Sequence, residues 1–376
     1  MLCNGKIRIF IEIALALLVA RCLLYSTSEI DKEKSEFVHR YEFLDMKQMH
    51  KLRQITKMLM TSGKGILAAD ESTGTIGKRF KLINLANTEE NRRRYRQMLF
   101  TTEGIEKYIS GVILFKETLG QKTDQGIKFT DFLKRVNVSI GLKLDEGLVP
   151  LRNSKEKVSQ GGTARLENLK EQIDTYRDEG ITFAKWRSVF EISTTTPSEN
   201  ALNENAKVLA KYAKICQQNG LVPIIEPEVL ADGDHNISKA QQVTERVLAH
   251  VYKALNDYNV YLEGTILKSN MVTEGFSHNP KTADSEIALA TVEAFRRIVP
   301  AAVPGIVLLS GGQTEAEATQ RLNSIVHVNL SKPWNITFSF GRALQISALK
   351  AWNGKNIEAA QKAFIERAKV NSDALR

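Results

Sequence analysis

The chain has 376 residues, enough for two average domains or for one large α/β barrel of about 250 residues with extensions. Hydrophobic residues make up 43% and charged residues 25%, close to globular averages, which excludes a disordered or fibrous chain. The formal net charge of +9 favours anionic partners, but basic residues are spread along the chain and no zinc-finger, basic-zipper or RNA-binding pattern occurs. We therefore expect phosphate-bearing metabolites as partners and no nucleic acid.

Cysteine and histidine usage argues against disulfides and bound metal. Cys3 and Cys22 lie near the N-terminus, which leaves Cys216 alone in the body of the chain and excludes a disulfide framework. The six histidines are scattered, without the H-x-x-x-H or C-x-x-C spacing of zinc sites. We therefore expect no metal and no other cofactor.

The N-terminal segment differs in composition from the rest of the chain. Residues 9–24 form an apolar run behind two basic residues, which is the charge order of a signal peptide or membrane anchor. A glutamate and an arginine interrupt the run and leave a clean apolar core of about nine residues, too short to span a bilayer comfortably. Two interpretations stay open: a targeting or anchoring segment, and a helical appendage or over-extended gene model. Residues 28–40 read as a charged linker, so we expect an extension over 1–40 and one domain over 41–376.

From about residue 64, short apolar and β-branched runs alternate with longer amphipathic stretches, which is the pattern of βα units around a parallel sheet. Eight such runs occur, and eight parallel strands favour a closed barrel over an open sheet. The predicted fold class is therefore α/β, a (β/α)8 TIM barrel. The predicted strands are 65–70, 111–115, 140–145, 183–190, 222–230, 261–268, 305–312 and 336–341.

The stretches between these runs are predicted to be helices because their ends carry capping and stop signals. The predicted ends are a capping box of Asn87 and Glu90 for a helix over 88–100, an N-cap at Ser198 with a stop at Gly220, and a helix from near Asp284 that stops at Pro300.

Ionisable and hydroxyl residues stand at the C-terminal ends of the predicted strands, although a strand buried on both faces should be almost entirely apolar. Barrel active sites are built on that face. For one isolated residue, contact with solvent is the simpler explanation, but several acids among several bases at one barrel mouth would be costly without a function. The pairs spaced to face one cavity are Lys143 with Asp145, Lys185 with Arg187, and Glu226 with Glu228. The other strand-end candidates are Asp70, Lys268, Ser310, Gly311, Gly312, Ser339, Gly341 and Arg342.

Six segments carry a resemblance to a known family. They are LAADES (67–72), FAKWR (183–187), VPIIEPE (222–228), LEGTILKSN (262–270), LLSGGQ (308–313) and SFGRALQ (339–345). In this order they closely resemble the motifs of class I fructose-bisphosphate aldolases, and the resemblance covers about residues 45–373.

The resemblance implies a Schiff-base mechanism with Lys268 as the reacting lysine. An uncharged amine attacks the ketose carbonyl, and the resulting protonated imine draws electrons from the C3–C4 bond as it breaks. The lysine must first lose its proton, which desolvation and a nearby cation assist, and Lys185 matches a family lysine that can supply this cation. Glu226 and Asp70 match the carboxylates near the proton transfers. Glu228 matches a residue that either supports the lysines or forms a structural ion pair.

The substrate's two phosphates require donors at opposite ends of the site. In the usual barrel phosphate site, backbone N–H groups after a strand, a helix N-terminus and an arginine converge on the anion. The resemblance implies Ser310, Gly311, Gly341 and Arg342 for the C1 phosphate, Ser72, Thr75, Arg79 and Lys143 for the C6 phosphate, and Arg187 and Ser339 as further substrate-binding residues.

The sequence departs from the family pattern at several positions. Ser269 replaces a proline that commonly follows the Schiff-base lysine, and Thr75 replaces a serine with another hydroxyl residue. Glu146 replaces a lysine and makes that rim more negative, so we expect weaker phosphate binding there. Family members usually continue into a tail that ends in tyrosine and assists proton exchange, whereas this sequence stops at Arg376, so we expect slower turnover of the bisphosphate.

The resemblance implies a lyase of glycolysis and gluconeogenesis that reversibly cleaves fructose 1,6-bisphosphate to dihydroxyacetone phosphate and glyceraldehyde 3-phosphate. It also implies a cytoplasmic homotetramer whose ligands are the phosphorylated ketose and the triose phosphates. Residues 9–24 leave a secretory or membrane-anchored location open. Two other functions stay open: a catalytically weak barrel that acts as a binding or scaffold protein, and a metal-dependent barrel lyase or hydrolase.

Overall fold

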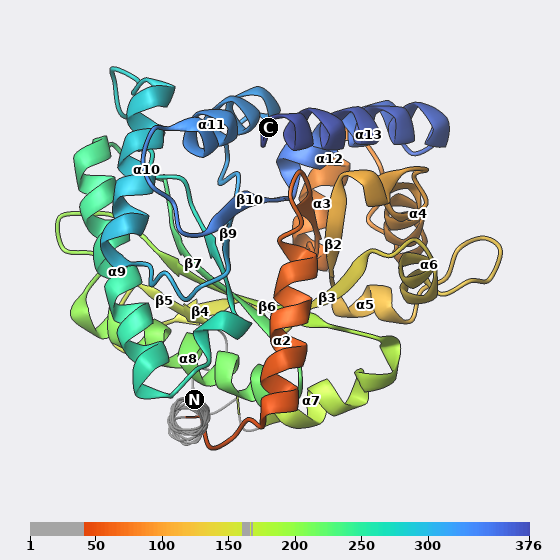
Figure 1. Ribbon diagram of the computed structural model, residues 1–376. Helices are drawn as coiled ribbons and strands as arrows, with labels where there is room; N and C mark the ends of the chain where they lie inside the picture. The colour runs from red at the N-terminus through yellow and green to blue at the C-terminus, as the bar shows by residue number, and fades with distance from the viewer. Residues whose placement is uncertain (1–40, 160–165, 167) are drawn as a thin grey trace, which may run out of the picture. The chain divides into compact units, whose positions relative to one another are not determined.

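The computed structural model describes residues 41–376, apart from residues 160–165 and 167 (Figure 1). The predicted extension, with its apolar segment 9–24, lies outside the described residues, so the boundary between extension and domain stays a prediction. Among the residues that the structure describes, no helix combines the length and apolar character needed to cross a bilayer.

A closed barrel of eight parallel strands lies in the compact unit that spans residues 48–376. The strand order around the barrel is β1-β10-β9-β8-β7-β6-β3-β2. The predicted (β/α)8 TIM barrel is therefore confirmed. The barrel strands are β1 (Gly65–Ala69), β2 (Ile109–Leu114), β3 (Ser139–Lys143), β6 (Phe183–Phe190), β7 (Val222–Val229), β8 (Ile266–Ser269), β9 (Gly305–Leu308) and β10 (Asn335–Phe340).

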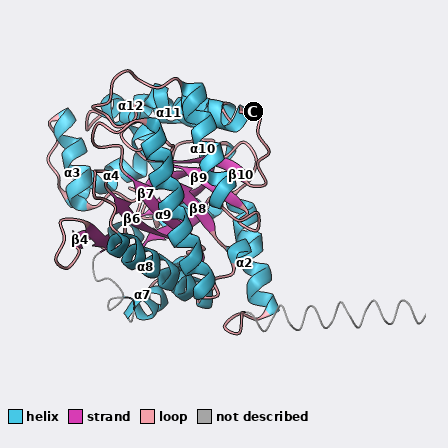
Figure 2. Ribbon diagram, turned by 90° about the vertical axis from the view of Figure 1, so that its left-hand side faces the viewer, coloured by secondary structure: helices cyan, strands magenta, loops and turns pink. Residues whose placement is uncertain are grey.

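Helices surround the strands, as Figure 2 shows. Parallel neighbours need a crossover that returns the chain to the start of the next strand, and the long helices provide it. The outer faces of the strands and the inner faces of the helices share one apolar core, to which Trp186, Ile225 and Phe340 belong. The helices are α2 (Met46–Leu59), α3 (Thr73–Phe80), α4 (Glu89–Phe100), α5 (Lys116–Leu119), α6 (Phe129–Arg135), α7 (Leu169–Thr175), α8 (Glu199–Gln218), α9 (Ile237–Asp257), α10 (Asp284–Ile298), α11 (Glu315–His327), α12 (Arg342–Trp352) and α13 (Ile357–Asp373).

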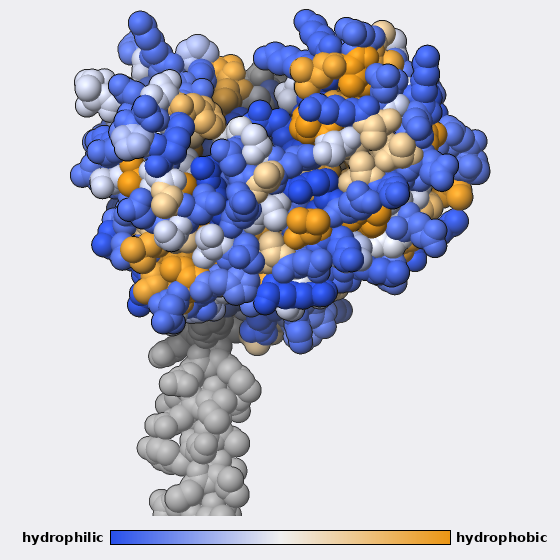
Figure 3. Space-filling model, turned by 90° about the horizontal axis from the view of Figure 1, so that it is seen from above, coloured by the Kyte–Doolittle hydropathy of each residue, from blue (hydrophilic) through white to orange (hydrophobic). Residues whose placement is uncertain are grey.

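Hydrophilic residues dominate the face drawn in Figure 3, and hydrophobic residues occur there in small separate groups. Scattered apolar residues of this kind are normal on the exterior of a globular protein. The apolar core residues lie instead on the inner and outer faces of the barrel strands.

The interior of the barrel is apolar at its floor and charged at its mouth. Residues two apart on a strand share a face, so Phe183 lies below Lys185 and Ile266 lies below Lys268 on the same strands. Phe183 and Ile266 are fully buried. The ring of Phe183 takes the space beside Gly141, its direct partner on β3, where a Cβ atom would stand 2.1 Å from the ring.

Several predicted element ends are confirmed and others are wrong, among them the strand predicted over 305–312, which ends at Leu308. Ser198 caps α8, which ends just before Gly220, and α10 begins at Asp284 and ends before Pro300. The N-cap of α4 is Thr88, which accepts from the Asn91 N–H, and not the predicted Asn87.

Asn87 is committed elsewhere, because its amide donates to the Thr73 carbonyl and its oxygens accept from Arg92. The predicted strand over 261–268 begins only at Ile266, after a 3-10 turn (η5, Leu262–Gly264). The short hairpin β4 (Leu148–Pro150) and β5 (Lys157–Ser159) was not predicted. The remaining 3-10 turns are η1 (Lys81–Ile83), η2 (Ile105–Lys107) and η4 (Arg177–Glu179).

Replacing Gly141 with alanine should destabilise the barrel by about 1–3 kcal/mol, because the new methyl group overlaps a buried ring that has no room to move. Urea denaturation gives the free energy of unfolding. Gly120→Ala is the matched control, since no atom lies within 4 Å of its Cβ position. Equal stability of the two variants would contradict this account of the barrel floor.

Candidate active site

A cavity of about 740 Å³ lies at the C-terminal ends of the strands. All the residues predicted for catalysis and substrate binding line it: Asp70, Ser72, Thr75, Arg79, Lys143, Lys185, Arg187, Glu226, Glu228, Lys268, Ser310, Gly311, Ser339, Gly341 and Arg342. The strand-end residues are therefore brought together at one mouth, as the barrel geometry requires.

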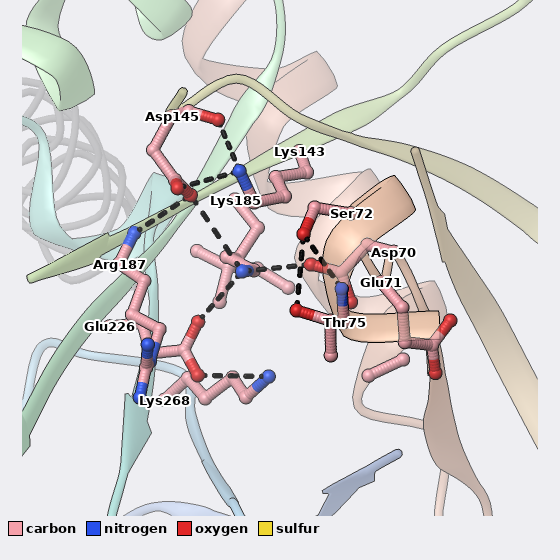
Figure 4. Close-up of polar contacts among 12 residues, drawn as sticks. Asp70, Glu71, Ser72, Thr75, Lys143, Asp145, Lys185, Arg187, Glu226 and Lys268 are labelled. Atoms are coloured by element: carbon pink, nitrogen blue, oxygen red, sulfur yellow. Dashed lines mark hydrogen bonds and ion pairs between the residues drawn. The ribbon is translucent and has the colours of Figure 1, made fainter. Parts of the chain in front are cut away.

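The centre of the cavity is a set of buried ion pairs around two lysines (Figure 4). The Lys185 Nζ lies 2.8 Å from Asp70 and 3.2 Å from Glu226. The other oxygen of Glu226 lies 3.1 Å from the Lys268 Nζ, so this carboxylate bridges the lysines. A third carboxylate, Asp145, lies 3.7 Å from the Lys185 Nζ.

Strand register explains why these side chains meet. On the paired strands β6 and β7, Arg187 stands opposite Glu226, and Lys185 lies two residues earlier on the same face. Lys268 lies one strand further round the barrel, on β8, which pairs with β7. Asp70 directly follows β1 and closes the cluster from the other side. Three different strands thus supply the neighbours of Lys185.

The pKa of Lys185 is raised and the pKa of Asp70 is lowered, although both groups are buried. Burial lowers the pKa of Lys185, but Asp70, Glu226 and Asp145 raise it well above its ordinary value. Burial raises the pKa of Asp70, but Lys185 and then Lys268 hold it far below its ordinary 3.8. Lys185 is therefore a permanent cation and Asp70 a permanent anion at neutral pH.

Glu226 is also ionised. Burial raises its pKa, but Lys185, Lys268 and Arg187 together lower it below the ordinary value. A carboxylate that touches two lysine nitrogens can take a proton from one of them, while the other lysine stabilises the ionised form from which it starts.

Arg187 and Glu228 form an ion pair on the side of the cavity towards Arg342. Burial lowers the pKa of Arg187, but Glu228 and then Glu226 raise it above its ordinary value. Among the described residues, Glu228 pairs with Arg187 and lies beyond ion-pair distance of either lysine. The sequence left two roles open for Glu228, support of the lysines and a structural ion pair. This geometry fits the structural ion pair.

The residues predicted for the C1 phosphate surround the start of α12. Gly311 and Gly312 adopt φ values of +41° and +93°, which favour glycine and turn the chain away after β9. Gly341 is the N-cap of α12, and Arg342 is its first residue. The Ser339 hydroxyl is buried without a hydrogen-bond partner in the described part of the chain. Backbone N–H groups, a hydroxyl and an arginine therefore face one region, which suits an anion.

Of the residues predicted for the C6 phosphate, Ser72 and Thr75 lie at the start of α3, Arg79 lies in its last turn, and Lys143 ends β3. Ser72 caps α3 and its hydroxyl lies 3.1 Å from that of Thr75. Arg79 is ion-paired with Glu71, and the Lys143 Nζ lies 2.7 Å from Asp145. Both cations of this end therefore already have a carboxylate partner.

Three residues of the site had no role in the prediction from sequence: Asp145, Glu71 and Gln345. Asp145 was placed beside Lys143 by spacing alone, yet it also accepts from the backbone N–H of Arg187 at 3.2 Å. Glu71 and Gln345 together hold Arg79. Both stand inside segments that carried the resemblance, so a polar residue within a motif was the available signal.

Metal ligands were not expected from the sequence. Over the residues that the structure describes, no group of three or more His, Cys, Asp or Glu side chains is arranged to hold a metal ion.

Comparison with known proteins gives one consistent result. The family model for glycolytic class I fructose-bisphosphate aldolase matches residues 51–376. The chain is 57% identical over 333 residues to fructose-bisphosphate aldolase 2 of Caenorhabditis elegans, covering 88% of this chain and 90% of that protein. It is 52% identical over 342 residues to human fructose-bisphosphate aldolase B, covering 90% and 93%.

A solved structure is also similar. Fructose-bisphosphate aldolase of Plasmodium falciparum, determined in complex with TRAP and a small-molecule inhibitor, matches with a TM-score of 0.86 and 47% identity, covering 88% of this chain and 96% of that one.

Replacing Lys185 with methionine should destabilise the protein by about 3–5 kcal/mol at pH 7, because it leaves buried Asp70 without its ion-pair partner and Glu226 with one lysine instead of two. The pKa of Asp70 is depressed in the native state, so the stabilisation is present above its ordinary value of 3.8 and is lost as the pH falls towards the native value. The deficit should therefore narrow below about pH 4 in urea titrations.

The control for this test is Lys253→Met, which removes an exposed ion pair with Asp257 and should change stability by about 1 kcal/mol or less. A deficit of Lys185→Met that stays constant from pH 7 down to about pH 2 would argue against the ionised carboxylates as its cause.

Proposed function

This chain belongs to the class I fructose-bisphosphate aldolase family, and from that premise we propose that Lys268 is the lysine that forms the Schiff base. The enzyme is a metal-independent lyase that reversibly cleaves fructose 1,6-bisphosphate to dihydroxyacetone phosphate and glyceraldehyde 3-phosphate in glycolysis and gluconeogenesis. One observation supports Lys268 best: its nitrogen is buried at the end of β8, 3.1 Å from a carboxylate that also touches Lys185.

Formation of the Schiff base requires proton transfer at Lys268. The amine attacks the C2 carbonyl, the carbonyl oxygen takes up protons, and that oxygen leaves as water when the imine forms. Glu226 lies within hydrogen-bond distance of the Lys268 nitrogen. We assign to Glu226 the acceptance of the lysine proton and the return of a proton to the departing oxygen. Lys185 stabilises the ionised form of Glu226 before the first transfer and after the second.

Cleavage breaks the C3–C4 bond and moves its electron pair into the protonated imine, while the C4 hydroxyl gives up a proton and becomes the aldehyde. Asp70 is ionised and held 2.8 Å from Lys185, so we propose that it orients the C4 hydroxyl and receives its proton. Because the pKa of Asp70 is so low, the proton moves only as the bond breaks. The positive charge of Lys185 compensates the negative charge beside the C4 hydroxyl.

The phosphates are proposed to bind at the two ends of the cavity. Its volume of about 740 Å³ falls in the range of small-molecule sites. Gly311, Gly341 and Arg342 supply backbone N–H groups and a cation for the C1 phosphate. For the C6 phosphate we keep Ser72 and Lys143 with their neighbours Thr75 and Arg79. Glu228 is proposed to hold Arg187 in place.

Two further properties are proposed from family membership. We propose that the protein works in the cytoplasm, and that four copies form a homotetramer, which sedimentation at four times the mass of one chain would test. Of the competing functions, the scaffold reading gains no support, since the relatives above 50% identity over most of the chain are aldolases.

Replacing Lys268 with arginine should abolish the covalent intermediate and lower kcat/KM by on the order of 10³-fold or more, because a guanidinium is not a nucleophile at neutral pH. Borohydride reduction with dihydroxyacetone phosphate, followed by peptide mass spectrometry, locates the adduct. The parent protein should carry it on Lys268, with or without a chelator, and Lys239→Arg, an exposed lysine change, should behave like the parent. An adduct on another lysine would refute the assignment.

Removing residues 1–40 should leave turnover and adduct formation unchanged within about twofold, because every proposed site residue lies in the unit over 48–376. Steady-state kinetics on the shortened and full-length proteins make the comparison. A loss of activity in a shortened protein that keeps its circular dichroism spectrum would show that the extension takes part in the site.

A further inference from the structure

Asp70, the residue proposed to receive the proton of the C4 hydroxyl, directly follows β1 at the point where that strand loses one neighbour. Pairing of β1 with β2 reaches Ala69, but pairing with β10 stops at Leu67, because β10 ends at Phe340 and the chain turns into α12. In the described part of the chain, the sheet therefore holds the end of β1 from the β2 side alone. Proton transfer tolerates little displacement, so other contacts must keep Asp70 in place.

Gln345 takes the place of the missing strand on the β10 side. The Ala68 carbonyl oxygen points to this side, since it lies 3.3 Å from the position that a Cβ atom of Gly341 would occupy. Gln345, fully buried in the first turn of α12, donates its amide N–H to that oxygen at 2.8 Å. The amide oxygen accepts from the Tyr95 hydroxyl at 2.9 Å and from Arg79 at 3.1 Å. These bonds fix the side chain in one orientation.

Arg96 holds the chain on the other side of Asp70. It is buried on α4, its Nη2 donates to the Glu71 carbonyl oxygen at 2.8 Å, and its Nη1 lies 3.1 Å from a carboxylate oxygen of Glu117. Its Nε is buried without a hydrogen-bond acceptor in the described part of the chain. A buried guanidinium with an unmatched donor is costly for stability. Such a cost is expected of a residue kept for function.

The two contacts belong to one closed circuit. The Glu71 carboxylate is ion-paired with Arg79, which also donates to Gln345. Contacts therefore run from Gln345 through Arg79 and Glu71 to Arg96, and both ends of this chain of contacts bind the backbone on either side of Asp70. In Figure 4 the side chains of Asp70 and Glu71 point in different directions. The circuit thus holds the backbone and leaves the Asp70 carboxylate facing the cavity.

We propose that Gln345 and Arg96 are positioning residues that hold Asp70 where it receives the proton of the C4 hydroxyl. The inference rests on the proposed function, which assigns that proton to Asp70. Neither Gln345 nor Arg96 lines the cavity, so both act through Asp70 and not on the substrate. Loss of either contact lets the end of β1 shift, which slows cleavage of the C3–C4 bond and leaves formation of the Schiff base unaffected.

Two substitutions remove these contacts selectively. Gln345→Glu keeps the oxygen that accepts two hydrogen bonds, but it places a second oxygen against the Ala68 carbonyl. Arg96→Lys keeps a positive charge beside Glu117, but it removes the second branch of the guanidinium, which reaches the Glu71 carbonyl.

In each variant, kcat for cleavage of fructose 1,6-bisphosphate should fall by about tenfold to a hundredfold, and KM should stay within about threefold. Borohydride trapping of dihydroxyacetone phosphate on Lys268 should proceed as in the parent, because that ligand has no C4 hydroxyl. Trapping that weakens in parallel with kcat would mean that the whole site is disturbed, and would overturn the proposal.

Tyr95→Phe is the matched control, since it removes a buried hydrogen bond of the same Gln345 side chain and leaves the bond to the Ala68 carbonyl in place. It should lower the melting temperature slightly and leave kcat within about twofold. A loss of kcat in Tyr95→Phe as large as in Gln345→Glu would show that altered packing is the cause, which would also contradict the proposal.

The sharpest comparison places Gln345→Glu or Arg96→Lys in an Asp70→Asn background. Asp70→Asn alone should lower kcat on the order of 10²- to 10⁴-fold and keep the adduct on Lys268. Because the positioning residues act through Asp70, the second substitution should lower kcat no further. A further loss as large as that in the parent would overturn the proposal, as would an unchanged kcat in both single variants. Full cleavage activity in Asp70→Asn would instead reject the proposed role of Asp70, and this inference with it.

Discussion

The barrel mouth depends on charge compensation around Lys185. Asp70, Asp145 and Glu226 reach its ammonium group from three strand ends, and all four groups are largely withdrawn from water. An isolated ion in such a place would cost several kcal/mol, so each member holds the others ionised. Among the described residues, Lys268 has only Glu226 within ion-pair distance, whereas Lys185 has three carboxylates. The lysine proposed to react, Lys268, thus has fewer carboxylate partners than Lys185.

Much of this arrangement could be predicted because, in a barrel, residues at the C-terminal ends of the strands lie together at one mouth. Apolar runs marked the strands, and charged residues at their C-terminal ends marked the site, since parallel strands share one mouth. Cross-strand register was not readable from one sequence. For that reason Asp145 was seen only as a neighbour of Lys143, while its contacts with Lys185 and the Arg187 backbone on β6 stayed hidden.

Local signals failed where tertiary contacts competed for the same side chain. Asn87 has the chemistry of an N-cap, but its amide binds the Thr73 carbonyl and its oxygens bind Arg92, so Thr88 caps the helix instead. Propensity ranks asparagine above threonine at this position, and the contacts of Asn87 with Thr73 and Arg92 reverse that order. Glu71 was passed over for the same reason, because its partner Arg79 becomes visible only once α3 is folded.

The ring of Phe183, seated against Gly141 at the barrel floor, has a consequence for the order of events in turnover. A floor sealed by a buried aromatic ring leaves the mouth as the route by which ligands enter and leave. The two products must therefore use one doorway in succession. The half proposed to be covalently attached to Lys268 stays behind while the free aldehyde departs. Because the floor is closed, both products share the route through the mouth.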